Sequence, residues 1–219
     1  MGLGAGSGGA LVRPHFELLF RERGLPGAIR SDNGPPFAST ALAGLSRLSV
    51  WWVRLGVPLE RIDPGCPQQN GWHERMHLSL EQSGAQRPRA DLGRQPRALE
   101  KFVQEYNYER PHEALGQRVP AELYAPSARR YEGRLPAARV YPEDWTTRAV
   151  RGGGPMKWGG RDVPGSDALA GERLGLEPRG DGLWAVWFEH PELGSFDERR
   201  GRIRGVRRLV APRVEEPLP

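Results

Sequence analysis

The sequence predicts a mixed α/β fold that is followed by a small β-barrel. Within residues 16–63 the apolar residues recur with helical spacing and then in short strand-like runs, an alternation typical of α/β structure. From residue 139 onward, short apolar or alternating runs are separated by Gly- and Pro-rich turns, and the clearest strand is GLWAVWFEH at 182–190. Residues 128–138 carry turn formers and arginines with little periodicity, so we expect a linker there.

The first part of the chain alternates between helices and strands. Phe16, Leu19 and Phe20 lie on one face of the first helix, which Gly24 ends. The first strand leads directly to Asp32, and ligand-binding residues favour this place at the carboxyl end of a strand in an open α/β sheet. In chain order the expected elements are a helix at 16–23, a strand at 28–31, a helix at 40–55, a strand at 59–63, a helix from 70 or 71 to 82, and a helix at 98–108.

The tryptophans fall into two groups. Trp51 and Trp52 lie near the end of a Leu-rich helix, and we expect them in the core. In the β-rich part, Trp158, Trp184 and Trp187 are predicted to be core or barrel-surface aromatics rather than base-stacking platforms, because apolar burial is the commoner use of the residue.

Composition limits the class of protein. The chain has 219 residues and a mass of 24.4 kDa, which is room for one large domain or two small ones. Its mean hydropathy is −0.62, and it has no run of about 18 apolar residues, which argues against a membrane span. The Gly-rich residues 1–10 lack the basic and apolar parts of a signal peptide, and we expect a flexible tail there. The single cysteine, Cys66, excludes an internal disulfide and indicates a cytoplasmic protein.

The charge balance indicates an acidic partner. The formal net charge is +5 and the pI is about 9.9, which favours binding to a polymer such as DNA. The densest basic run, residues 199–208, has six arginines in ten residues and no acid. Ile203 lies between two arginines with the alternation of a strand, so those arginines share one face. We expect phosphate contacts here, and the alternative is a solvated edge strand that its charge protects from aggregation. The candidate DNA-binding residues are Arg199, Arg200, Arg202 and Arg204.

A loop and the helix after it, residues 63–82, form the most informative stretch. Proline and glycine residues predict turns at its start, and a helix follows. Glu74 lies in or near the first turn of that helix. A carboxylate in this place is a candidate metal ligand, and it is also the ordinary charge that complements the helix dipole. The residue alone does not decide between the two interpretations.

The same helix contains a zinc-binding pattern. His73-Glu74-Arg75-Met76-His77 matches the H-E-x-x-H motif of zinc metalloproteases, with both imidazoles on one helical face. Glu100 or His112 is a candidate third ligand. The polar flanks and the Pro/Gly-rich loop ahead of the motif argue against zinc, and the alternative is two partly exposed histidines on a solvated helix.

Three segments in order carry a family resemblance. They are SDNGPPF at residues 31–37, PQQNGWHER at 67–75 and YNYERPHEAL at 106–115. Together they resemble the integrase-type catalytic core of DDE insertion-sequence transposases, which are relatives of retroviral integrase. The resemblance covers residues 29–124 and continues less sharply to about residue 208.

The resemblance implies a domain organisation and an activity. It implies a partial ribonuclease-H-like core at residues 11–127 and, after the linker at 128–138, an SH3-like β-barrel at 139–211 that binds DNA, with 212–219 as a tail. The implied activity is magnesium-dependent phosphodiester cleavage and strand transfer in DNA transposition. The implied partners are transposon ends, target DNA, and either a further copy of this chain or a full-length transposase. The implied location is the bacterial nucleoid.

The resemblance also implies site residues. Asp32 and Glu74, with 41 residues between them (74 − 32 − 1), match two of the three carboxylates that hold two magnesium ions in the family, with manganese as a substitute. The residues that match the DNA-contacting loop and helix are Gln68, Gln69, Asn70, Arg75 and His77.

The sequence departs from the family pattern in two ways. The family's first aspartate lies on the opening strand of the sheet, roughly 45 residues or more before the second, and none of residues 1–31 is an aspartate. Positions that are commonly basic in the family are Cys66, Trp72, Leu78 and Glu81 here, which weakens the attraction of phosphates. We therefore expect an N-terminally truncated transposase that does not catalyse by itself. The alternative is a non-catalytic DNA-binding remnant.

Overall fold

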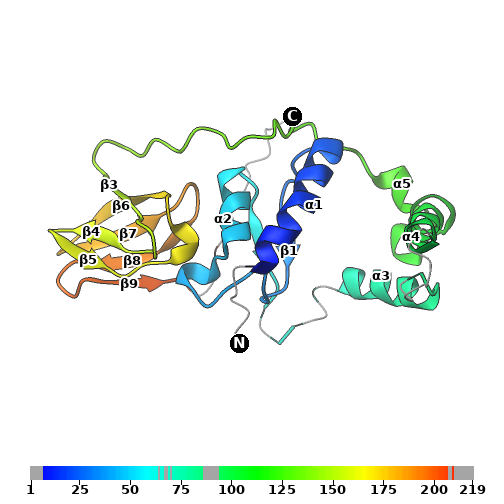
Figure 1. Cartoon of the computed structure of the whole chain (residues 1–219), viewed down its shortest axis with the longest axis horizontal. Coiled ribbons are helices and arrows are strands. Elements are labelled where there is room, and N and C mark those ends of the chain that lie inside the picture. The colour runs from blue at the N-terminus through cyan, green and yellow to red at the C-terminus, as the bar shows by residue number, and fades with distance from the viewer. Residues whose placement is uncertain are drawn as a thin grey trace. The chain divides into compact units, whose positions relative to one another are not determined.

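The structure, a computed structural model, describes residues 7–63, 65–66, 69, 71–85, 94–206 and 209. By packing, the chain divides into two units (Figure 1). The first, here called the sheet unit, combines Met1–Pro64 with Ser127–Pro219, and the second, the helical unit, is Gly65–Pro126. This division differs from the predicted one, in which residues 11–127 form one domain and 139–211 another.

Helix α1 (Ser7–Arg23) opens the described part of the sheet unit. It ends at Gly24, as the sequence predicts, because a φ of +78° is a left-handed conformation that stops a helix. The helix begins at Ser7, so the last residues of the tail predicted at 1–10 are helical instead. The inner face of α1 carries Phe20, whose ring stacks on Trp51 with the centroids 5.5 Å apart. This ring contact ties α1 to the next helix.

Helix α2 (Arg47–Arg54) is shorter than the helix predicted at 40–55. The first residues of that range form a turn that contains the 3-10 helix η1 (Leu42–Gly44). The difference arises because Ser46 caps α2. Its side chain accepts a hydrogen bond from the Ser49 N–H, and the Ser49 hydroxyl accepts one from the Ser46 N–H at 2.8 Å.

Two short strands form a parallel pair, β1 (Ile29–Ser31) and β2 (Leu59–Arg61). The register places Ile29 beside Leu59 and Ser31 beside Arg61. Both strands lie within the ranges predicted from the sequence. Because the strands are parallel, the residues that follow them leave the same edge of the pair.

The remaining strands of the sheet unit form an antiparallel sheet and a separate hairpin. The sheet has five strands in the order β3-β6-β7-β8-β9, and the hairpin pairs β4 with β5. Their bounds are β3 Thr146–Ala149, β4 Met156–Trp158, β5 Arg161–Val163, β6 Arg173–Gly180, β7 Leu183–Trp187, β8 Glu192–Asp197 and β9 Arg202–Gly205. The β character predicted for this region is thus confirmed, and β7 is the clearest predicted strand with an earlier end.

The predicted closure into a barrel is not confirmed. β3 and β9 are the edges of the sheet, and no strand pair in the described ranges joins them. The first part of the chain lies against one of these edges. A Cβ atom on Gly205 of β9 would lie 3.0 Å from the backbone nitrogen of Ala43 and 3.1 Å from Leu42 Cδ1. The turn at η1 therefore packs on the Gly205 end of β9.

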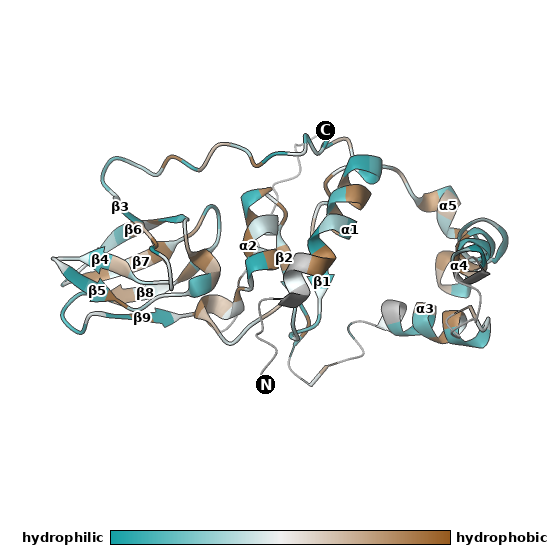
Figure 2. Ribbon diagram, viewed as in Figure 1, coloured by the Kyte–Doolittle hydropathy of each residue, from teal (hydrophilic) through white to brown (hydrophobic). Residues whose placement is uncertain are grey.

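One hydrophobic core joins α1 and α2 to the five-stranded sheet. Figure 2 colours the apolar stretches of these elements brown. Trp52 is fully buried and Trp51 is 5% exposed, which confirms the prediction that both belong to the core. Leu176, Val186 and Phe196 come from three neighbouring strands and belong to the same cluster. Residues far apart in the sequence thus bury one another.

The three tryptophans of the sheet and hairpin are half-buried. Trp158 meets Trp184 edge-on with centroids 4.8 Å apart, and it meets Phe196 in the same way at 5.0 Å. The indole nitrogen of Trp187 donates a hydrogen bond to Glu177 Oε2 at 3.0 Å. All three therefore pack as core or surface aromatics, as the sequence predicts.

The segment 128–140 has no helix or strand, but it is fixed to the rest of the sheet unit (Figure 1). The guanidinium of Arg129 donates to the backbone oxygens of Leu55 and Gly56, at 3.2 and 2.9 Å, and so caps the end of α2. Tyr131 packs edge-on against Phe20 with centroids 6.0 Å apart. The predicted linker is thus irregular in structure but packed.

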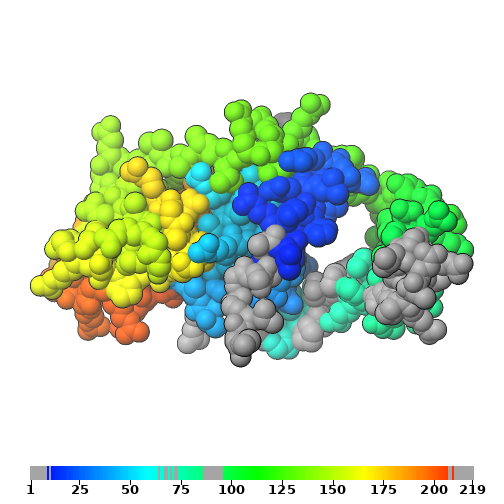
Figure 3. All heavy atoms as spheres, viewed as in Figure 1, coloured from blue at the N-terminus to red at the C-terminus, as the bar shows by residue number. Residues whose placement is uncertain are grey.

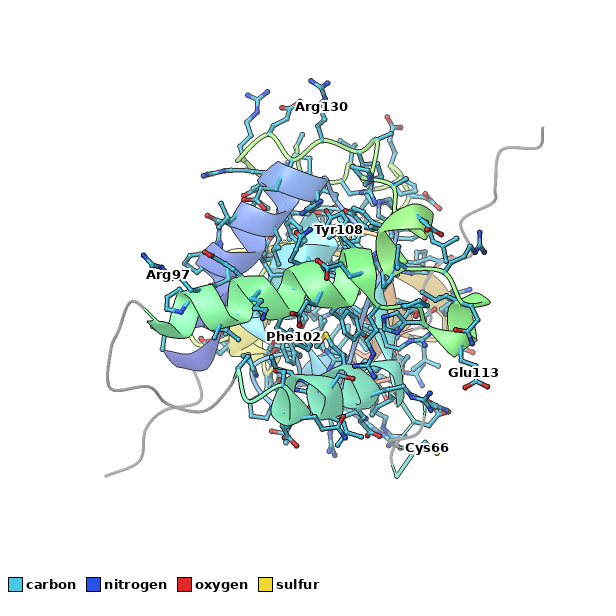
Figure 4. All side chains as sticks on the ribbon, turned by 90° about the vertical axis from the view of Figure 1, so that its right-hand side faces the viewer. Cys66, Arg97, Phe102, Tyr108, Glu113 and Arg130 are labelled. Atoms are coloured by element: carbon cyan, nitrogen blue, oxygen red, sulfur yellow. The ribbon has the colours of Figure 1, made fainter. Side chains whose placement is uncertain are left out.

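The helical unit contains α3 (Gly71–Gln82), α4 (Arg94–Gln104), the π-helix η3 (Glu105–Glu109), the 3-10 helix η4 (Glu113–Leu115) and α5 (Pro120–Leu123). α4 and η3 run on continuously and carry Phe102 and Tyr108 (Figure 4). The helix predicted at 98–108 is thus confirmed with an earlier start, and it ends where Arg110 takes an extended conformation before a proline. Among the described helices of the whole chain, none is long and apolar enough to cross a membrane.

Candidate functional site

Asp32 follows β1 directly, at the strand end where the sequence predicts it. Its side chain is exposed, and its Oδ1 accepts a hydrogen bond from the Gly34 N–H at 3.1 Å. The next residue, Asn33, donates from Nδ2 to the backbone oxygen of Ile62 at 2.9 Å, which links the loops that leave the two parallel strands. These bonds hold the carboxylate in a defined turn at the carboxyl edge of the pair.

Arg61 is a neighbour of this carboxylate that the motif analysis does not identify. It lies opposite Ser31 in the parallel register, and its Nη2 donates to the backbone oxygen of Phe37 at 3.0 Å. Burial lowers the pKa of the Arg61 guanidinium, and the nearby charge of Asp32 opposes that shift. The signal that could have found Arg61 is the parallel pairing itself, because it brings the last residues of both strands to one edge.

Glu74 lies in the first turn of α3, as predicted, and its side chain is exposed. Arg75 next to it is exposed and His77 is half-buried. Of the three residues matched to the DNA-contacting loop, Gln69 is exposed, whereas Gln68 and Asn70 lie outside the described residues.

Asp32 belongs to the sheet unit and Glu74 to the helical unit, so each carboxylate is described within its own unit. Their pairing at one metal site therefore stays a prediction. Within the described parts of the chain, no three His, Cys, Asp or Glu side chains are grouped so that they could hold a metal ion.

The zinc alternative depends on residues of the helical unit. The side chain of His73 lies outside what the structure describes, and Glu100 is exposed on α4. His112 packs its ring edge-on against Tyr106 with centroids 4.6 Å apart, and its Nε2 lies 3.2 Å from the Tyr106 backbone oxygen. The imidazole is thus engaged with the π-helix of its own unit, and the zinc set stays a prediction.

The described arginines of the run, Arg199, Arg200, Arg202 and Arg204, lie on β9 and on the turn before it. Arg202 lies opposite Asp197 and Arg204 opposite Ser195, which places both arginines on one face of the sheet. Ile203, between them, lies opposite Phe196 on the other face. The alternation predicted from the sequence is confirmed.

The side chains of these four arginines are exposed. Arg200 shares its charge with Asp197, since Nε lies 3.4 Å from the Oδ2 atom. Arg199, Arg202 and Arg204 form no ion pair with any residue that the structure describes. The face therefore offers arginines whose charge no described acidic residue neutralises.

Comparison with protein families identifies the segment that carries Glu74. Residues 55–120 match the model of the integrase core domain. The matched segment begins at Leu55, after α2, and runs through β2, α3 and α4 to Pro120 at the start of α5. The integrase core model thus matches 66 residues of the chain (120 − 55 + 1), and Glu74 lies among them. The family has a ribonuclease-H-like fold and generally depends on divalent metal ions, which agrees with the mixed α/β class.

Two curated relatives come from insertion elements. The chain is 31% identical over 121 residues to the uncharacterized 31.7 kDa protein of insertion element IS407 from Burkholderia multivorans, covering 55% of this chain and 42% of the relative. It is 30% identical over 121 residues to the uncharacterized 39.2 kDa protein of insertion element IS476 from Xanthomonas euvesicatoria, covering 55% of this chain and 33% of the relative. The chain thus spans less than half the length of the curated relatives that it matches. The resemblance to insertion-sequence transposases with an integrase-type core is confirmed.

Proposed function

We propose that this chain is part of an insertion-sequence transposase that binds DNA and carries two of the carboxylates used for phosphodiester cleavage and strand transfer. The observation that supports it is the integrase core match across β2 and α3, within which Glu74 occupies the first turn of the helix after the Asn-Gly loop. Asp32 lies outside the match, and its position at the end of β1 supports the same role.

The residues fit a divalent cation by their chemistry. Asp32 and Glu74 both expose carboxylate oxygens, which are the hard ligands that magnesium and manganese take. In such a site a bound ion supplies Lewis acidity that stabilises charge on the phosphate oxygens. The Gly34 N–H orients the Asp32 carboxylate, and the half-buried guanidinium of Arg61 balances its charge before DNA arrives.

We further propose that this 219-residue polypeptide does not cleave or join DNA by itself. Residues 1–31 contain no aspartate to complete a three-carboxylate set. The activity would then require a full-length transposase that supplies the third carboxylate, at the bacterial nucleoid. The exposed arginines on β9 support the second candidate function, a non-catalytic DNA-binding protein, and the five-stranded region would be its SH3-like DNA-binding domain.

The test combines a binding assay with a strand-transfer assay on the same chain. A labelled duplex should bind with an affinity that falls steeply with salt, and no metal-dependent nicking or joining should appear with Mg²⁺ or Mn²⁺. Glu74→Gln is compared with Glu81→Gln, an identical change at another exposed position of α3.

The outcomes separate the two parts of the proposal. Metal-dependent strand transfer that Glu74→Gln abolishes and Glu81→Gln leaves intact would refute the proposed inactivity and support an active transposase. Failure of the unaltered chain to bind DNA at low salt would refute both candidate functions.

A further inference from the structure

A groove of about 680 Å³ lies in the sheet unit, between the turn before α2 and the strand β9. Its walls include Thr40 and the residues of η1 on one side and Arg200 to Ile203 on the other, with Pro164 and Gly165 between. Among the described residues that line it, Arg200 and Arg202 are the charged ones. Figure 3 shows the blue residues of the turn next to the orange residues of β9.

The turn that forms one wall is held in a defined conformation. Ala43 and Gly44 both have left-handed backbones, with φ of +53° and +69°. The Gly44 N–H donates to the Ala41 oxygen at 2.8 Å, and Ser39 Oγ donates to the Leu45 oxygen at 2.5 Å. Because the turn also lies against Gly205, the groove exists before any ligand binds.

The charge along the groove has one sign. Arg202 has no ion-pair partner among the residues that the structure describes, and Arg200 shares its charge with Asp197 at 3.4 Å. Gly201 lines the groove without a side chain, and no atom lies within 4 Å of the place its Cβ would take, so a polymer backbone can approach the main chain closely there. These features fit a ligand with a negative charge on each repeating unit.

We propose that this groove holds the phosphodiester backbone of one DNA strand, with Thr40 and the η1 turn as part of the DNA interface. The inference rests on the proposed function, and it adds residues that neither the arginine run nor the integrase core match contains. Thr40 and Arg202 are separated by most of the chain, so no local pattern connects them, and only the packing of the turn on β9 does.

The closing experiment measures the binding of a fluorescent duplex of about 30 base pairs of arbitrary sequence to the full chain. At about 0.1 M salt, one phosphate contact contributes roughly eightfold to affinity, so Arg200→Gln combined with Arg202→Gln should weaken binding about 60-fold and lower the salt slope by about two. The matched control removes Arg130 and Arg134, two exposed arginines of segment 128–140 that do not line the groove. Figure 4 shows Arg130 at the outer surface of that segment.

A second pair of variants tests the turn itself. Thr40→Glu introduces a negative charge at an exposed position of the groove wall, and Thr40→Gln is its neutral match. We expect Thr40→Glu to weaken binding about eightfold or more, since it opposes one phosphate, and Thr40→Gln to bind like the unaltered chain. If Thr40→Glu and Thr40→Gln bind equally well while the double arginine variant binds more weakly, the proposed role of the groove is wrong and the proposed DNA binding stands. No binding by the unaltered chain would overturn both.

Crosslinking gives a readout that does not depend on affinity or on the stability of the charge variants. A benzophenone amino acid in place of Thr40, in an otherwise unaltered chain, should form a protein–DNA adduct on irradiation with duplex present. The same probe at Arg130 should form little. An adduct between two protein chains at Thr40, or none, would overturn the proposal.

Discussion

Arg54 connects three parts of the sheet unit, and its replacement gives a sharp test of the packing. The side chain is 11% exposed at the end of α2. Its Nη1 lies 2.5 Å from Glu189 Oε1, and its Nε lies 3.5 Å from Glu172 Oε2. Its Nη2 donates to the backbone oxygen of Pro136 at 3.2 Å, in the segment 128–140.

Arg54→Ala would leave the carboxylate of Glu189, a residue only 8% exposed, without its guanidinium. Removing one partner of a buried ion pair costs about 3–5 kcal/mol. A domain has about 5–15 kcal/mol of stability in total. For a urea m-value of about 2 kcal/mol per molar, the unfolding midpoint should fall by about 2 M.

The assay is equilibrium unfolding in urea followed by tryptophan fluorescence, since Trp51 and Trp52 lie in the core of this unit. The control is Arg30→Ala, which breaks a pair with Glu60 whose side chains are 54% and 43% exposed and should cost about 0–1 kcal/mol. Adding Glu189→Gln to Arg54→Ala should recover part of the loss, because it removes the unpaired charge. An Arg54→Ala cost no larger than that of Arg30→Ala, or no recovery in the double variant, would refute the reasoning.

Three further predictions concern other parts of the chain. Tyr141→Phe removes the hydroxyl that accepts the Glu189 N–H at 3.0 Å, and urea unfolding should show a loss of about 1–2 kcal/mol. Burial raises the pKa of Tyr141 above its ordinary value of 10.0. The contribution of Tyr141 to the free energy of unfolding is therefore complete below pH 10 and is lost as the pH rises through the raised pKa. Tyr141→Phe should not show this loss of stability at alkaline pH. Elemental analysis of the purified chain after dialysis should find no stoichiometric zinc. One zinc ion per chain that is lost in His77→Ala would favour the zinc-metalloprotease interpretation of the H-E-x-x-H motif instead. Gly194→Ala places a Cβ against the backbone oxygen of Arg204 at a φ of +150°, so amide exchange should accelerate in β9 but not in β3.

Local patterns predicted the elements that depend on local chemistry. The short segments before Asp32 and Asp63 predicted both parallel strands, and the turn signals before Glu74 predicted the start of α3. The alternation around Ile203 gave the face on which its neighbouring arginines lie. In each case the predictive signal lies in residues close in sequence.

Of the differences, one has a local cause and the others depend on residues far apart in the sequence. The predicted start of the helix at residue 40 was wrong, although the Leu-rich periodicity begins there. Ser46 caps α2, and the left-handed backbone of Ala43 prevents a helix from extending through the residues before the cap. The packing of the η1 turn on Gly205 of β9 could not be predicted, because the two segments are some 160 residues apart in the sequence. Arg61 was missed for the same reason, since its relation to Asp32 depends on strand pairing.

The discontinuous make-up of the sheet unit has a consequence for the order of folding during synthesis. Trp51 acquires its contact with Tyr131, and Arg54 its bond to Glu189, only after the 62 residues of the helical unit (126 − 65 + 1) have been translated. Closing a flexible segment of that length costs about 3.7 kcal/mol by the logarithmic chain law, less if the helical unit folds first. The nascent N-terminal segment therefore emerges from the ribosome with its apolar face unsatisfied, and a premature stop before residue 127 would release a product that chaperones and proteases recognise rather than a stable half-protein.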